Sequence, residues 1–280
     1  MSARPVHQVL RDFTSVCQRT SLVTAARWTA TLAARLPECA KNRSLRPADQ
    51  SWALAGARFR TSTGAVVALP GAYTAGAREM YCRNVYLRTG LVMPNTGWVL
   101  DLGANCGLFS VWAALSGART IAVEAQYGFA QEIHHLAVHN AVNERIHIEI
   151  ATASGVKTSG SEVGQLGDNQ VWSLTSHGGP THPVDRSVPE LIAAYDIDRV
   201  GLLKMDIEGG EFAILAADED LTWLHHVDQL AIELHGSHGD VPAMIGRLRG
   251  AGLAVDLRDD FGRRAPATSS SVAYAYCRRL

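Results

Sequence analysis

Short apolar runs that alternate with helix-like stretches dominate the chain from position 98 onward. The runs read WVLDLG, RTIAVEA, RIHIEIATA, LLKMDIEG and QLAIELHG, and helices are expected between most of them at 107–117, 128–142, 187–196 and 210–217. Strands that alternate with helices form βαβ units, and a parallel sheet that is covered on both faces has strands that are apolar throughout. Two last runs, GLAVDLRDD and SVAYAYCRR, are joined by a polar loop and predict an antiparallel hairpin. The pattern therefore predicts an α/β fold.

The N-terminal third of the chain has a different pattern. Apolar residues recur at helical spacing from Leu22 to Leu36, and Pro37 is expected to end that helix. Two β-prone runs predict a hairpin over 56–70, and a helix is expected over 77–92.

On this basis the chain divides into an N-terminal helical and hairpin accessory region, residues 1–95, and a main α/β domain, residues 96–280. Residues 1–55 are expected to pack as helices over the main domain, with a lid or a dimer-forming arm as the alternative. The stretch 155–185 is loop-like, and a loop of this length inside a domain is often functional.

Composition and charge exclude several classes of protein. The 26 lysines and arginines nearly balance the 27 aspartates and glutamates, whereas nucleic-acid-binding proteins carry a basic excess, so we expect no nucleic-acid partner. The apolar runs are too short to cross a bilayer, and no secretory signal follows the first residues. The five cysteines are scattered without a CxxC pair, which favours a reducing cytoplasm.

The segment VLDLGANCGLFS is the clearest candidate for a cofactor site. Asp101 ends an apolar strand, Gly103 permits a tight turn, and Gly107 lies where the next helix begins. Cofactors with a pyrophosphate are usually bound by a GxGxxG loop, but this segment has Asn105 in place of a glycine. An acid at position 101 would also repel the two phosphates, so such a cofactor is disfavoured. S-adenosylmethionine has no phosphate, and its ammonium and sulfonium groups suit Asp101. Glu124 ends the second strand at the spacing of an acid that binds ribose hydroxyls.

Acidic residues collect at the ends of the fourth and fifth predicted strands. Asp206 and Glu208 are two apart and would share one face of an extended chain, as would Glu233 and His235. Glu211 follows where a helix begins. Because the carboxyl ends of these strands form the ligand crevice of an open α/β sheet, the five side chains are expected to converge there.

Four carboxylates and one imidazole in one place need a proton, a cation or hydrogen-bond donors to offset their repulsion. Strand alternation is expected to point Lys204 to the opposite side of the sheet. One interpretation is a general base, drawn from Asp206, Glu208, Glu211 and His235. A second is a divalent metal such as Mg²⁺, held by Asp206, Glu233 and His235. The third interpretation is purely structural: Glu211 caps a helix, and His235 makes hydrogen bonds in the core.

Taken together, these segments resemble the FkbM-type family of S-adenosylmethionine-dependent methyltransferases. The matching pieces are VLDLGANCGLFS, AVEA, LLKMDIEGGE and IELHG, in family order from about Gly97 to Gly236; the family's usual proline is replaced by Ala125. The resemblance implies a Rossmann-like class I methyltransferase fold, with a mostly parallel seven-stranded sheet, a C-terminal antiparallel hairpin and an N-terminal extension. It also implies methyl transfer to oxygen, and it places at the cofactor Asp101, Gly103, Asn105, Gly107 and Glu124.

We therefore expect a cytoplasmic methyltransferase that O-methylates a hydroxyl of a sugar or polyketide-type natural product, as in antibiotic biosynthesis. An alcohol must lose a proton, which calls for a base or a metal, whereas an amine needs only to arrive neutral. N-methylation of an aminosugar or aminoglycoside therefore stays open. A nucleotide-dependent oxidoreductase and a non-catalytic binding protein of the same fold are more distant alternatives. The expected partner is a small polar acceptor molecule, with no membrane partner and with a homodimer as an option.

Overall fold

A computed structural model describes residues 3–42, 44–52, 54–71, 76–154, 184–218 and 220–280. The loop predicted at 155–185 falls outside the described residues except for its last two positions. None of the helices in the described part of the chain is both long and apolar enough to cross a membrane.

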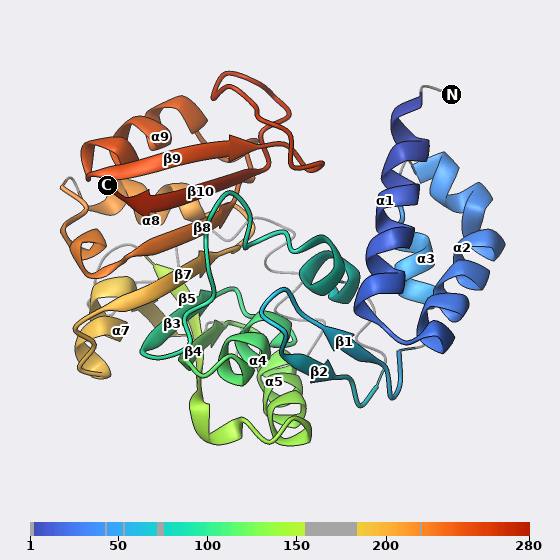
Figure 1. Cartoon of the computed structure of the whole chain (residues 1–280). Helices are drawn as coiled ribbons and strands as arrows, with labels where there is room; N and C mark the ends of the chain where they lie inside the picture. Colours follow the sequence, from blue (N-terminus) through green and yellow to red (C-terminus); the bar gives the residue numbers. More distant parts are fainter. Residues whose placement is uncertain (1–2, 43, 53, 72–75, 155–183, 219) are drawn as a thin grey trace.

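An eight-stranded sheet runs through the centre of the molecule (Figure 1). Its spatial order is β6, β5, β4, β3, β7, β8, β10, β9, and every neighbouring pair is parallel except the two pairs that involve β10. The strands are β3 (Trp98–Leu102), β4 (Arg119–Glu124), β5 (Ile146–Ser154), β6 (Val184–Ser187), β7 (Val200–Met205), β8 (Gln229–Glu233), β9 (Leu253–Arg258) and β10 (Tyr274–Arg279).

The predicted α/β class, the five apolar strands and the terminal hairpin are all present. The sheet has one strand more than the seven expected, because residues 184–187 pair in parallel with the end of β5. The chain leaves β3 toward β4 on one side and returns to β7 on the other, so the strand order reverses between β3 and β7. In open α/β sheets ligands bind at such a switch point, beyond the carboxyl ends of the strands.

Helices cover both faces of the sheet and create two apolar clusters. On one face lie α4 (Leu108–Leu115) and α5 (Tyr127–His139), and on the other lie α7 (Val188–Ala194), α8 (Gly210–Ala217) and α9 (Val241–Gly250). Short 3₁₀ turns cover Asn143–Arg145 and Thr222–His226. Helix α9 was not among the predicted helices; it starts at an Asp240 cap, followed by Pro242 in its first turn.

The accessory region comprises α1 (Ala3–Arg19), α2 (Leu22–Asn42), α3 (Arg46–Ser51), the antiparallel pair β1 (Arg58–Arg60) and β2 (Val66–Ala68), and a π-helical turn at Arg78–Arg83. The predicted hairpin over 56–70 is confirmed. The apolar cluster that contains Trp28, Trp52 and Phe59 also contains Trp112 of α4 and Tyr276 of β10. The accessory region and the main domain therefore share one core cluster.

Two predictions for this region were wrong. Pro37 lies inside α2 and does not end it. Cys39, two residues after the proline, is buried in the core cluster, so packing outweighs the lost backbone hydrogen bond. The helix expected over 77–92 stops at Arg83, and Asn84 adopts the left-handed region with φ of 53°. Residues 85–87 are consecutive and all buried. A helix with a single apolar face cannot bury three consecutive side chains, because they point in different directions around its axis.

Candidate active site

The turn after β3 lies at the switch point of the sheet. Gly103, Asn105 and Gly107 all have positive φ, of 75°, 50° and 82°, and α4 begins directly after Gly107. A Cβ atom at Gly103 would lie 1.8 Å from the carbonyl oxygen of Asp206, so only glycine fits where this turn touches the end of β7. The turn predicted to bind the cofactor therefore lies directly against the strand end that carries the predicted acids.

Glu124 is tied to this turn from the end of β4. One of its carboxylate oxygens accepts the backbone N–H of Asn105 at 2.8 Å, and the other accepts the N–H of Gln126 at 2.9 Å. Burial raises the pKa of Glu124, while these two backbone donors act to lower it. The structure thus brings together Glu124 and the glycine turn, as the sequence predicted.

Asp101 and Lys204 form a buried ion pair, which differs from both predictions for these residues. Asp101 is fully buried; its carboxylate accepts Lys204 Nζ at 2.9 Å and the Ser110 hydroxyl at 2.6 Å, so it offers no surface to a ligand. Lys204 does not point away from the acids: its Nζ also donates to the carbonyl of Gly103 at 3.0 Å and lies 3.9 Å from Asp206 Oδ2. Positions 204 and 206 have the same parity along the strand, which places them on the same face.

The remaining predicted acids and the imidazole do converge, and we call Asp206, Glu208, Glu211, Glu233 and His235 the carboxyl-edge cluster. Within it, the hydroxyl of Tyr86 lies 2.6 Å from Asp206 Oδ2 and 2.8 Å from Glu233 Oε2. Burial and the nearby charge of Asp206 raise the pKa of Glu233 to about 8. Glu233 therefore holds a proton near neutral pH.

His235 sits between two carboxylates. Its Nδ1 lies 3.0 Å from Glu211 Oε1 and its Nε2 lies 3.3 Å from Glu208 Oε2. The hydrogen bond with Glu211 raises the pKa of His235 to about 9, against burial, which lowers it. The ring is therefore an imidazolium at neutral pH and is not a free base.

Glu208 and Glu211 occupy positions that the sequence only partly predicted. Strand β7 ends at Met205, and Glu208 has a φ of 55° and a side chain that is 76% exposed, so it does not share an extended face with Asp206. Glu211 caps the loop before α8, because its Oε1 accepts the backbone N–H of Ile207 at 2.9 Å. Its other oxygen, Oε2, is buried and has no hydrogen-bond partner among the described residues.

Part of the cluster has metal-ligand spacing. Ligand atoms of Asp206, Glu211 and His235 all lie within 4.8 Å of one another. This group differs from the predicted ligand set, because Glu211 takes the place of Glu233, which faces Tyr86 instead.

Sequence reasoning missed Ser110 and Tyr86. Ser110 is the third residue of α4, where its hydroxyl can reach the acid in the preceding strand, Asp101. Its position in the sequence could therefore have suggested this hydrogen bond. Tyr86 comes from the accessory region, and nothing in the local sequence connects it with residues more than a hundred positions later. Cys106, in the turn, is a thiol with its pKa raised to about 12 by burial.

A glycine turn at the switch point, with acids at the neighbouring strand ends, places the candidate site where open α/β sheets bind their ligands. Residues 101–253 match the family model described as "Methyltransferase FkbM domain". The chain belongs to this family and is a methyltransferase.

Two curated proteins are similar in sequence. The "31-O-demethyl-FK506 methyltransferase FkbM" of Streptomyces tacrolimicus is 27% identical over 215 residues, which cover 65% of this chain and 82% of that protein. The "AMB antimetabolite synthetase AmbE" of Pseudomonas aeruginosa is also 27% identical over 65% of this chain, but the match spans only 11% of the synthetase.

Solved structures are similar at a lower level. A precorrin-6y C5,15-methyltransferase from Geobacter metallireducens has a TM-score of 0.42 and 11% identity, over 71% of this chain and 88% of that one. An O-methyltransferase from Bacillus cereus, solved in complex with SAH, has a TM-score of 0.38 and 12% identity, over 65% of this chain and 74% of that one.

Proposed function

We propose that this protein uses S-adenosylmethionine to O-methylate a hydroxyl of a small polar molecule, a sugar or a polyketide-type natural product. The observation that carries the proposal is the contact between Gly103 and Asp206, which puts the predicted cofactor turn and the carboxyl-edge cluster in one place. Family membership supports the transfer of a methyl group. The printed names of the two curated relatives, an FK506 methyltransferase and an antimetabolite synthetase, support a role in natural-product or antibiotic biosynthesis.

The residues around the turn fit S-adenosylmethionine. Glu124 faces the turn with lone pairs left on both oxygens and is suited to accept ribose hydroxyls. Gly103, Asn105 and Gly107 would form the wall beside the methionine part, and Asp101 would act through Lys204 rather than by contact. When bound, the cofactor supplies an electrophilic methyl group on a sulfonium.

We propose that Asp206 is the general base that accepts the proton of the acceptor hydroxyl. Glu233 is protonated near neutral pH and His235 is an imidazolium, so neither is a ready base. The side chain of Asp206 is 25% exposed, so an acceptor hydroxyl can reach it, and its Oδ2 lies 3.9 Å from Lys204 Nζ. An acceptor hydroxyl would pass its proton to Asp206 while its oxygen takes the methyl group, and the carbon–sulfur bond would break to leave S-adenosylhomocysteine as a neutral thioether. Glu208 lies at the exposed rim, where it would orient His235 or the acceptor.

A transfer assay tests this function. The protein is incubated with methyl-labelled S-adenosylmethionine and three probes: 31-O-demethyl-FK506, methyl α-rhamnoside and the methyl glycoside of glucosamine. Label on a hydroxyl oxygen supports the proposal. Calorimetry with S-adenosylmethionine and S-adenosylhomocysteine is run in parallel, and binding that Glu124→Ala weakens supports the cofactor assignment. Cofactor binding without transfer to any wider panel of alcohols would favour a non-catalytic binding protein.

N-methylation is the second candidate, because the cluster has an excess of acid. Within the part of the chain that the structure describes, and with Glu233 protonated, the three carboxylates of Asp101, Asp206 and Glu211 face two cations, Lys204 and His235. Such a site attracts a cationic aminosugar. Label on nitrogen of the glucosamine probe, with none on the two alcohols, would select this candidate.

A divalent metal is supported by one further observation. Glu211 Oε2 is buried, and no residue in the described ranges gives it a hydrogen bond. A buried carboxylate oxygen is costly unless a cation or donor reaches it. Carboxylate oxygens together with an imidazole suit Mg²⁺ less well than Mn²⁺ or another transition ion. Activity that is lost with EDTA and restored by Mg²⁺ or Mn²⁺ would establish the metal; activity unchanged by EDTA would leave the group as a hydrogen-bonded acid cluster.

The cytoplasmic location and the oligomeric state stay predictions. Several apolar side chains of the first two helices are exposed, among them Leu10, Phe13, Leu22 and Val23. A homodimer through this surface is tested by light scattering after size exclusion, and a monomer at high protein concentration would remove the idea.

A further inference from the structure

Tyr86 belongs to the accessory region, yet its hydroxyl lies inside the carboxyl-edge cluster. It contacts Asp206 Oδ2 at 2.6 Å and Glu233 Oε2 at 2.8 Å, from two different strand ends. The tyrosine is 5% exposed, so it has almost no surface for a substrate. Its role is therefore to hold other side chains.

The aromatic ring of Tyr86 is fixed on three sides. It packs edge-to-face on Phe109 at 5.7 Å and on Tyr274 at 6.0 Å between ring centroids, and Lys204 Nζ lies 5.1 Å from its centroid. A ring held in this way presents its hydroxyl in one direction. The carboxyl groups of Asp206 and Glu233 are thereby given a common hydrogen-bonding partner.

We propose that Tyr86 is a positioning residue of the methyl-transfer site, whose hydroxyl holds the side chains of Asp206 and Glu233 in the orientation that receives the acceptor. This inference rests on the proposed function, since it gives Asp206 its task. It assigns part of the active site to the accessory region.

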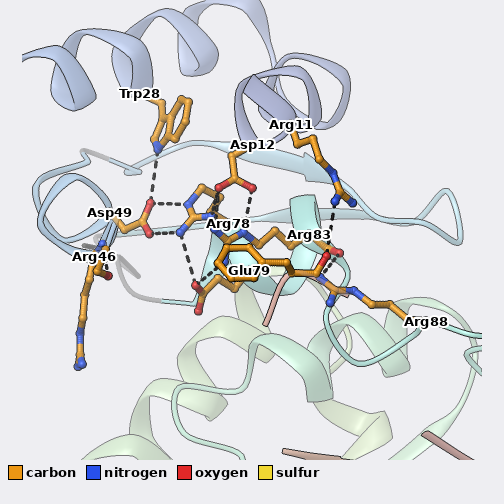
Figure 2. Close-up of polar contacts among 11 residues, drawn as sticks. Arg11, Asp12, Trp28, Arg46, Asp49, Arg78, Glu79, Arg83 and Arg88 are labelled. Carbon is orange, nitrogen blue, oxygen red and sulfur yellow. Dashed lines mark hydrogen bonds and ion pairs between the residues drawn. The ribbon is translucent and has the colours of Figure 1, made fainter. Parts of the chain in front are cut away.

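The accessory region holds Tyr86 in place through a buried group of charges, which we call the N-terminal charge cluster: Asp12, Asp49, Arg78, Glu79 and Arg83 (Figure 2). Arg78 and Arg83 are the first and last residues of the π-helical turn, which ends three residues before Tyr86. Arg78 binds Asp49 of α3 at 2.6 and 2.8 Å and Asp12 of α1 at 3.0 Å.

Further contacts join the same segment to the main domain. The hydroxyl of Tyr81 donates to the carbonyl of Leu108 at 2.9 Å, at the start of α4, and the hydroxyl of Tyr276 donates to the carbonyl of Val85. The backbone that leads into Tyr86 is therefore anchored, and removal of the hydroxyl alone leaves this backbone and the ring contacts in place.

The test uses Tyr86→Phe with Tyr195→Phe as its matched control. Tyr195 also gives a 2.6 Å hydrogen bond to a carboxylate, that of Glu149, but it packs with Trp98 and His147 at the amino ends of the strands, away from the site. Tyr86→Phe removes the hydroxyl contacts with Asp206 and Glu233, and Tyr195→Phe removes the one with Glu149. Each variant keeps its aromatic ring, so both are expected to stay folded and to bind S-adenosylmethionine with unchanged affinity. Activity is measured with whichever of the three probes accepts label: 31-O-demethyl-FK506, methyl α-rhamnoside or methyl glucosaminide. Tyr86→Phe is expected to lower kcat roughly 10- to 100-fold with little change in the KM for the cofactor. Tyr195→Phe is expected to leave both kcat and this KM unchanged.

A crystal structure of Tyr86→Phe tests the same point without an acceptor. We expect the side chains of Asp206 and Glu233 to separate or to take a second conformer, while they keep their places in Tyr195→Phe. Unchanged side chains together with unchanged kcat would overturn the inference. Should Tyr86→Phe fail to fold, the structure of Glu233→Gln decides: the Tyr86 hydroxyl must still lie between side chains 206 and 233. The wild-type protein could fail to methylate any acceptor while the crystal structure of Tyr86→Phe still shows displaced side chains at Asp206 and Glu233. That result would contradict the proposed function but would leave the positioning role of Tyr86 in place.

Discussion

The N-terminal charge cluster and the carboxyl-edge cluster are built in opposite ways. In the N-terminal charge cluster, Arg78 and Arg83 bind carboxylates in bidentate fashion, and Asp12 and Asp49 each receive at least two charged donors. In the carboxyl-edge cluster, the carboxyl groups of Asp206 and Glu233 share one hydroxyl, and a buried oxygen of Glu211 has no hydrogen-bond partner in the part of the chain that the structure describes.

The difference separates a structural role from a functional one. Burial would lower the pKa of Arg78, but the hydrogen bond and charge of Asp49, with the charges of Asp12 and Glu79, raise it above its usual value. All charges in that cluster are therefore satisfied within the fold. The carboxyl-edge cluster carries an acid excess and a raised pKa at Glu233, which is the pattern expected where a proton, a cation or a substrate completes the site.

The largest effect is expected from Arg78→Met. The change leaves Asp49 buried without its main cation, and the loss of one partner from a buried pair typically costs about 3–5 kcal/mol. Denaturant unfolding should show this loss in the free energy of unfolding. Lost activity with an unchanged unfolding free energy would instead show that this cluster serves the reaction directly.

Asp206→Asn tests the opposite cluster. We expect kcat to fall about 10²- to 10⁴-fold, because the amide cannot take the acceptor's proton, while S-adenosylmethionine binding is kept. Asp228→Asn, which breaks an exposed ion pair with Arg199, is the control and should leave kcat unchanged. Equal activity of both variants would remove Asp206 as the base.

The pH dependence of stability should trace to His235. Its folded pKa of about 9 exceeds the ordinary value of 6.5, so the stabilisation by the imidazolium is complete below about pH 6.5 and is lost as the pH rises through 9. The unfolding free energy of the wild type minus that of His235→Gln should therefore shrink between pH 6.5 and 9. A constant difference across this window would contradict the ion pairs with Glu211 and Glu208.

The smallest effect is expected at the rim of the N-terminal charge cluster. Glu79 is 47% exposed and pairs with Arg83 at 3.2 Å and Arg78 at 3.5 Å. Water screens such pairs, so Glu79→Gln should lower the unfolding free energy by less than about 1 kcal/mol. A loss as large as that of Arg78→Met would show that the rim is as essential as the buried centre.

The sheet and the position of the site were predictable, because strand length, apolar runs and the turn at Gly103 are local properties of the sequence. The end of α2 was not, because burial of Cys39 outweighs the local effect of Pro37. Nor was the break after Arg83, which depends on three adjacent side chains that are buried against different neighbours.

The sequence by itself determined the α/β class, the family and the acids that gather at the carboxyl ends of β7 and β8. The apolar pattern of each strand and the spacing of the motif residues are properties of neighbouring residues, so they can be read without the tertiary structure. Only the tertiary structure decided which of these acids are paired. Lys204 neutralises Asp101, Glu211 holds His235, and Tyr86 joins Asp206 to Glu233. These partners come from segments far apart in the chain, and hydrogen bonds act over about 3 Å, so they depend on how the elements pack.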